Sequence, residues 1–123
     1  MEAISSPTIG VAAREFLDSM IATRNENTAR SYANGIAAFL HILEENGEKV
    51  DALPARQLKE EAITWLADYL KLMSPATEKL YLHIVRNFYE FLVARDYAAV
   101  NFPRLRLLLM QKTRHSGRRQ LEV

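Results

Sequence analysis

Side chains that commonly perform chemistry are few in this chain and stand far apart. The three histidines, His41, His83 and His115, fall on three different segments, and the chain has no cysteine. A metal site needs several His, Cys, Asp or Glu residues at spacings that bring them to one point, and no such spacing occurs. We therefore expect no metal ion and no cofactor, and solvent-facing helix positions explain the histidines better.

Two other catalytic patterns are also missing. Glu44-Glu45 and Glu60-Glu61 are adjacent pairs, so their side chains diverge by about 100° on a helix and cannot act on one substrate. The glycines, at positions 10, 35, 47 and 117, are too far apart to form a phosphate-binding loop. The sequence does not support catalysis.

One domain of ordinary size is what 123 residues with 49% hydrophobic content predict. The lack of cysteine excludes disulfides and cysteine-based zinc sites. No apolar run approaches the roughly 18 residues of a membrane span, and the N-terminus shows no basic segment followed by an apolar one. We expect a cytoplasmic protein with no membrane partner.

Basic residues are concentrated near the end of the chain. Residues 1–103 carry 10 Lys or Arg and 14 Asp or Glu, although the whole chain has a formal net charge of +1. Residues 104–119 hold six basic residues and no acid, namely Arg104, Arg106, Lys112, Arg114, Arg118 and Arg119. Such a block is typical of a solvated tail and also of a phosphate-binding segment, and charge alone leaves both open.

Apolar residues recur with helical spacing, and no useful stretch alternates with period two, which predicts an all-α domain. The helical segments run over about 11–21, 28–46, 58–73 and 74–95, and a short fifth helix is expected near 105–110. Asn46-Gly47 predicts a left-handed end to the second segment. Ser74-Pro75 predicts the start of the fourth, with Ser74 as its N-cap.

Each of the four segments has one apolar stripe, which we expect to face the core. Trp65 lies on such a stripe, so it is expected in the core rather than as a stacking platform. The stripe residues are Val11, Phe16, Leu17, Met20 and Ile21; Ala29, Tyr32, Ile36, Phe39, Leu40 and Leu43; Leu58, Ala62, Trp65, Leu66, Tyr69 and Met73; and Leu80, Ile84, Phe88, Phe91 and Leu92.

The opposite faces of the second and fourth segments carry polar side chains that can donate to phosphate oxygens or base edges. They are Asn27, Arg30, Ser31, Asn34 and His41 on the second, and Lys79, His83, Arg86 and Asn87 on the fourth, whose polar face also holds the acid Glu90. The polar positions of the third segment lean acidic instead. A solvated surface also explains the basic stripe of the fourth. Gly35, Ala37 and Ala38 fit either a close approach to DNA or close helix packing.

Several short motifs follow one another in a recognisable order. They are Thr28-Ala-Arg-Ser-Tyr32, Trp65-Leu66, Ser74-Pro-Ala-Thr77, Val85-Arg-Asn-Phe-Tyr89, Phe91-Leu92 and Asn101-Phe-Pro103. Each motif is weak alone. Together, over about residues 10–103, they resemble the N-terminal core-binding domain of tyrosine recombinases, the phage-integrase and Xer-like family.

The resemblance implies a compact SAM-like bundle of four to five helices that forms one jaw of a clamp around duplex DNA, with the second and fourth helices facing the major groove. It also implies a tail at 1–9, a DNA-binding domain at 10–103, and a basic linker at 104–123 leading toward a catalytic domain. The DNA-binding residues expected are Asn27, Thr28, Arg30, Ser31, Asn34, Lys79, His83, Arg86, Asn87, Arg104, Arg106, Lys112, Arg114, Arg118 and Arg119.

Catalysis in this family belongs to a domain that the chain does not show. None of the five tyrosines can be assigned as the nucleophile, and His115-Ser-Gly-Arg118 fits the family's His-x-x-Arg pattern only by coincidence. We expect a DNA-binding domain of a site-specific recombinase, by itself not an enzyme. Its expected partners are duplex DNA and other recombinase protomers assembled on DNA, and alone it should be monomeric. The alternative is a helical protein-interaction module with a solvated basic tail.

Overall fold

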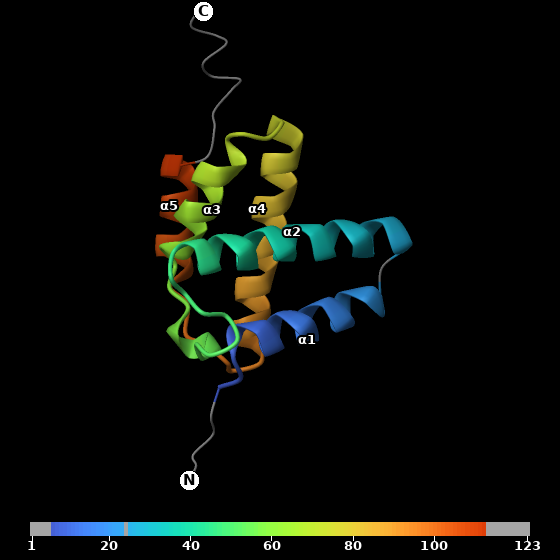
Figure 1. The fold of residues 1–123 in the computed structure, drawn as a ribbon, viewed down its shortest axis with the longest axis vertical. Helices are drawn as coiled ribbons and strands as arrows, with labels where there is room; N and C mark the ends of the chain where they lie inside the picture. Colours follow the sequence, from blue (N-terminus) through green and yellow to red (C-terminus); the bar gives the residue numbers. More distant parts are fainter. Residues whose placement is uncertain (1–5, 24, 113–123) are drawn as a thin grey trace, which may run out of the picture.

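The computed structural model describes residues 6–23 and 25–112, which form five α-helices and one short 3-10 helix (Figure 1). No named strand occurs in these two ranges, so the all-α prediction is confirmed. The elements are α1 (Ile9–Ile21), α2 (Glu26–Glu45), η1 (Ala55–Gln57), α3 (Ala62–Leu70), α4 (Pro75–Ala94) and α5 (Phe102–Lys112).

The helices form two sets that run across each other. Figure 1 shows α1 and α2 side by side, with α3, α4 and α5 running across them. Within the second set, α3 contacts both α4 and α5. The core lies where the two sets meet, because both α1 and α2 contact α4 there.

Side-chain caps fix where the helices begin. The side chain of Ser74 accepts a hydrogen bond from the Thr77 backbone N–H at 3.2 Å, and Pro75 occupies the first turn, as predicted. Asn25 caps α2 in the same way, accepting from the Thr28 N–H at 2.8 Å. Gly47, just past the end of α2, has a φ of +84°, the left-handed conformation that Asn46-Gly47 predicted.

Aromatic rings from four positions along the chain fill the centre of the core. The Phe16 ring centroid lies 5.4 Å from those of both Phe88 and Phe91. Phe39 lies 6.4 Å from Phe88, in an edge-on arrangement that the charge distribution of aromatic rings favours. These contacts tie α1 and α2 to α4.

Some of the predicted stripe positions are wrong. Val11 is 38% exposed and Ile21 is 55% exposed, because α1 starts at Ile9 and turns a different face, including Ala12, inward. On α4, Leu80 is 41% exposed. The buried face there is wider than one stripe because α4 packs against α1, α2 and α3 together. Its buried apolar residues are Leu82, Ile84, Val85, Phe88, Tyr89 and Leu92.

The third predicted segment is also shorter than expected. Leu58 has the extended backbone conformation, with φ −70° and ψ 124°, and follows η1 rather than starting a helix. Its side chain is still buried, so the apolar pattern identified a core residue but the wrong local structure. Trp65, on α3, is half-buried and packs against the core, in agreement with its expected place on the stripe.

Contacts with the bundle extend beyond both ends of residues 10–103. Residues 6–9 belong to the folded domain, since the Ala55 N–H donates to the Pro7 carbonyl at 2.7 Å and Ile9 is fully buried. Residues 104–112 lie in α5, and Leu105 is only 1% exposed. Over these residues the basic block is helical, in agreement with the short fifth helix expected near 105–110, and it contacts the bundle. Residues 1–5 and 113–123 lie outside the described part of the chain.

Ion pairs hold α5 against α3. Arg104 binds the carboxylate of Glu61, and Lys112 Nζ lies 3.4 Å from Asp68 Oδ1. Lys71 also donates to the backbone carbonyl of Lys112. The hydrogen bond from Arg104 holds the pKa of the Glu61 carboxyl below its usual value. The acidic residues of α3 thus bind cations of α5.

Gly35 allows α2 and α4 to approach each other. A Cβ atom at this position would lie 3.1 Å from Ile84 Cδ1 and 3.2 Å from Ile84 Cγ2. Of the two explanations for the small residues of this helix, close helix packing therefore applies to Gly35. Ala37 is exposed, and Ala38 packs against the core.

Replacing Gly35 should strain this contact. Gly35→Val should lower the free energy of unfolding by about 1–3 kcal/mol in urea titrations, because the new methyl groups overlap the Ile84 side chain. Ala37→Val on the exposed side of α2 is the matched control. It should lower the free energy of unfolding by only a few tenths of the amount expected for Gly35→Val. Adding Ile84→Ala should make the combined cost smaller than the sum of the two single costs. Additive costs, or equal costs for the valine variants, would contradict the close contact.

The Arg104–Glu61 pair should make stability depend on pH. A carboxyl with a lowered folded-state pKa stabilises the fold above its unfolded-state pKa, and this contribution is lost as the pH falls through the folded-state pKa. Arg104→Gln should therefore destabilise the domain at pH 7 by about 1 kcal/mol or less, since the pair is exposed. Thermal unfolding should show that the stability difference between Arg104→Gln and the unchanged protein vanishes in acid. Arg106→Gln should show no such pH-dependent difference, and equal behaviour of the two variants would contradict the pairing.

Candidate nucleic-acid interface

A hydrogen bond links α2 and α4 next to their polar residues. Asn87 Nδ2 donates to the Tyr32 hydroxyl oxygen at 3.1 Å. Tyr32 is only 6% exposed, and its ring packs 5.9 Å from that of Phe16, so the hydroxyl is held in place by the core. The Asn87 side chain is therefore fixed against α2.

Asn87 is held by a second partner on its own helix. Its Nδ2 lies 3.3 Å from His83 Nε2, one helical turn earlier. With the amide nitrogen engaged by Tyr32 and His83, the Oδ1 oxygen remains to accept a hydrogen bond from a ligand. A preoriented amide at a helix surface suits the recognition of base edges in a major groove.

Exposed basic side chains share α4 with this amide. Lys79 and Arg86 are exposed cations, and His83 is exposed as well. Arg86 Nε lies 3.7 Å from Glu90 Oε2, and both side chains are more than half exposed, so the ion pair is weak and leaves Arg86 able to meet another anion. This side of α4 can therefore contact phosphate groups.

The N-terminal half of α2 completes the surface. Arg30 is exposed and donates to Asn27 Oδ1 at 3.5 Å, across one helical turn. Asn34 is also exposed, whereas Thr28 and Ser31 are half-buried. Ser31 and Asn34 flank the contacts that α2 makes with α4 through Tyr32 and Gly35. We define the α2–α4 surface as Asn27, Thr28, Arg30, Ser31, Asn34, Lys79, His83, Arg86 and Asn87.

The basic residues expected in a linker fall into different places. Arg104 and Lys112 face α3 and pair with its acids, so they do not join the α2–α4 surface. Arg106 is exposed and, together with Arg86 and Glu90, lines a hollow of about 180 Å³ between α4 and α5. Arg106 thus extends the basic side of α4. Arg114, Arg118 and Arg119 lie outside the described residues.

The tyrosines with shifted pKa values are structural. Burial raises the pKa of Tyr89 well above its ordinary value, and its hydroxyl donates to the Lys59 carbonyl at 2.7 Å. A hydrogen bond to Glu15 raises the pKa of Tyr97. Both hydroxyls thus make hydrogen bonds within the fold.

The part of the chain that the structure describes brings together no group of three or more His, Asp or Glu residues that could hold a metal ion. Among the same residues, no helix combines the length and the apolar character needed to cross a bilayer.

Periodicity missed the role of the Tyr32 hydroxyl. Tyr32 stands on the apolar stripe of α2, where its ring contributes to the core, so the sequence placed it away from the polar face. A tyrosine at the edge of such a stripe, beside serine and arginine, is the signal that could have suggested a polar role. Its partner Asn87 is 55 residues away in the sequence, which no local pattern reveals.

Comparison with known proteins identifies the domain family. Residues 13–96 match the family model described as phage integrase, N-terminal SAM-like domain. No curated protein and no solved structure matches the chain. The matched span is more than half of the chain and covers α1 to α4 with the contacts described above, so the chain belongs to the family of phage integrase N-terminal SAM-like domains.

Proposed function

We propose that this domain binds duplex DNA through the α2–α4 surface and grips the recombination site for a tyrosine site-specific recombinase. The observation that carries the proposal is the hydrogen bond from Asn87 to Tyr32, because it fixes the Asn87 amide of α4 against α2 beside exposed basic and polar side chains. Membership of the integrase family supports the same function.

The surface offers both kinds of contact that DNA recognition uses. Arg30, Lys79 and Arg86 can neutralise phosphates, which supplies affinity without sequence preference, and Arg106 of α5 extends this basic side. Asn87 presents an oriented amide to base edges. We infer that binding by the domain alone is weak, strongly salt-dependent and modest in sequence preference.

The proposed role is positioning and not catalysis. No described residue is assigned a chemical step, and in the family the cleavage of DNA belongs to another domain. The partners proposed are duplex DNA and other recombinase protomers assembled on it, during DNA integration or recombination in the cytoplasm. The isolated domain is proposed to be a monomer.

Charge changes on α4 and at Arg106 of α5 should alter DNA affinity in opposite directions. Arg86→Gln and Arg106→Gln should each weaken binding and reduce the slope of log K against log salt by about 0.9, the effect of one lost phosphate contact. Glu90→Gln should strengthen binding, since it removes a negative charge beside Arg86. Fluorescence anisotropy with a labelled duplex measures both quantities.

Arg104→Gln is the matched control for these variants. It removes the same charge as Arg106→Gln, but Arg104 is paired with Glu61 against α3, so the salt slope should stay unchanged. If Arg104→Gln lowered the slope as much as Arg86→Gln, DNA would lie on the α5 side of the domain and the proposed surface would be wrong.

Asn87 should control sequence preference and not general affinity. Selection from a pool of random duplexes should give about tenfold less enrichment with Asn87→Ala, the effect of one lost base contact. Tyr32→Phe should also lower the enrichment, because it removes the hydroxyl that holds the Asn87 amide in place. Lys79→Gln should weaken binding to all sequences alike. Unchanged enrichment with Asn87→Ala would exclude base recognition by this residue.

A further inference from the structure

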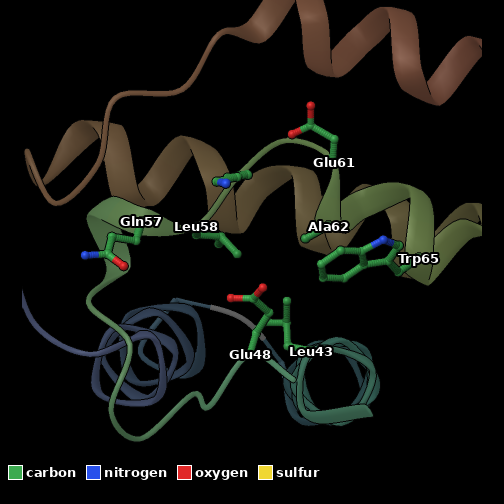
Figure 2. Close-up of a pocket in the computed structure, with 8 residues that line it drawn as sticks. Leu43, Glu48, Gln57, Leu58, Glu61, Ala62 and Trp65 are labelled. Atoms are coloured by element: carbon green, nitrogen blue, oxygen red, sulfur yellow. The ribbon is translucent and has the colours of Figure 1, made fainter. Parts of the chain in front are cut away.

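A second hollow opens at the opposite end of α2. It has a volume of about 300 Å³ and lies between the C-terminal end of α2, the segment after η1 and the start of α3 (Figure 2). Leu43, Leu58 and Ala62 give it apolar walls, and the ring of Trp65 closes one side. This volume is at the lower end for ligand sites and suits one long side chain.

One carboxylate is available inside this hollow. Glu48 is half-buried, and Figure 2 shows its carboxylate turned toward the space between Leu58 and Trp65. Within the described residues it makes no ion pair and no side-chain hydrogen bond. Glu61 also stands at the rim, but its carboxylate points away, toward α5, where it binds Arg104. Lys59 is the one cation among the lining residues, and it is exposed.

These groups determine which kind of side chain the hollow can bind. A carboxylate partly withdrawn from water gains most from a cationic hydrogen-bond donor. An indole ring is the best aromatic surface for a cation, and the planar guanidinium group can stack on it while pairing with a carboxylate. The three-carbon stem of arginine would then lie against the apolar lining beside Leu58.

We propose that this hollow is a docking site for an arginine side chain in a basic segment of a partner protein. The guanidinium group stacks on Trp65 and pairs with Glu48, and the apolar walls hold the stem. Phosphate groups do not fit, because they would be placed beside the Glu48 carboxylate.

The site is separate from the α2–α4 surface. The hollow lies at the end of α2 near Leu43, whereas the proposed DNA-binding residues of α2 lie before Gly35. Figure 1 shows the two ends of α2 on opposite sides of the molecule. DNA and a protein partner could therefore be bound at the same time. The proposal does not rest on DNA binding and can fail or succeed independently of it.

Trp65 provides a direct measurement, because it is the single tryptophan of the chain. The full chain is titrated with the blocked tripeptide acetyl-Ala-Arg-Ala-amide, and the same peptide with citrulline in place of arginine is the neutral control. The arginine peptide should change the Trp65 emission saturably with a Kd of about millimolar, the affinity expected for one side chain. The citrulline peptide should give no saturable change, and equal binding of both peptides would overturn the proposal.

Two rim variants test the charge requirement. Glu48→Gln should weaken binding of the arginine peptide by about fivefold, and Lys59→Gln should strengthen it, since the first removes the attractive charge and the second a repulsive one. Circular dichroism and thermal unfolding establish that both variants fold. Unchanged binding by Glu48→Gln, or weaker binding by Lys59→Gln, would contradict the proposed site. A duplex that binds without changing the Trp65 emission would support two separate sites, and a duplex that displaces the peptide would overturn this one.

Discussion

The contact between α2 and α4 is the constraint on which the rest of the molecule depends. Gly35 brings the two helices close enough for Ile84 to fill the space that a side chain would need. The same approach places the Tyr32 hydroxyl 3.1 Å from Asn87 Nδ2. A wider crossing would separate these atoms, and the polar faces of the two helices would become independent surfaces. Helix packing and the candidate DNA interface are thus consequences of one contact.

Charge is distributed unevenly around this frame. The acids of α3 bind Arg104 and Lys112, so α5 is attached to the bundle through Leu105 and through ion pairs. Arg106 has its side chain on the side toward Arg86, where a hollow separates α4 from α5. The basic block therefore serves two purposes, since part of it secures a helix and part extends a basic surface. Individually these exposed pairs are weak, and burial of Leu105 contributes the larger stabilisation.

Local patterns in the sequence predicted the local features and failed where distant residues meet. Ser74-Pro75 and Asn46-Gly47 marked helix ends correctly, because caps and left-handed turns depend on neighbouring residues. The wheel positions of Lys79, Arg86 and Asn87 also placed these side chains on the accessible side of α4. The pairing of Glu61 with Arg104 spans 43 residues, so periodicity could not show that a predicted linker residue is bound to α3. Leu80 was misplaced because a stripe does not reveal how many helices surround it.

The central claim is that DNA lies against the α2–α4 surface. Backbone amide shifts of the isotopically labelled chain, recorded by NMR during titration with a duplex at low salt, test it most directly. The largest shift changes should fall on the amides of Arg30, Ser31, Asn34, His83, Arg86 and Asn87. The amide signals of α3 residues such as Asp68 should change little. Changes concentrated on α3, or no changes at low salt, would contradict it.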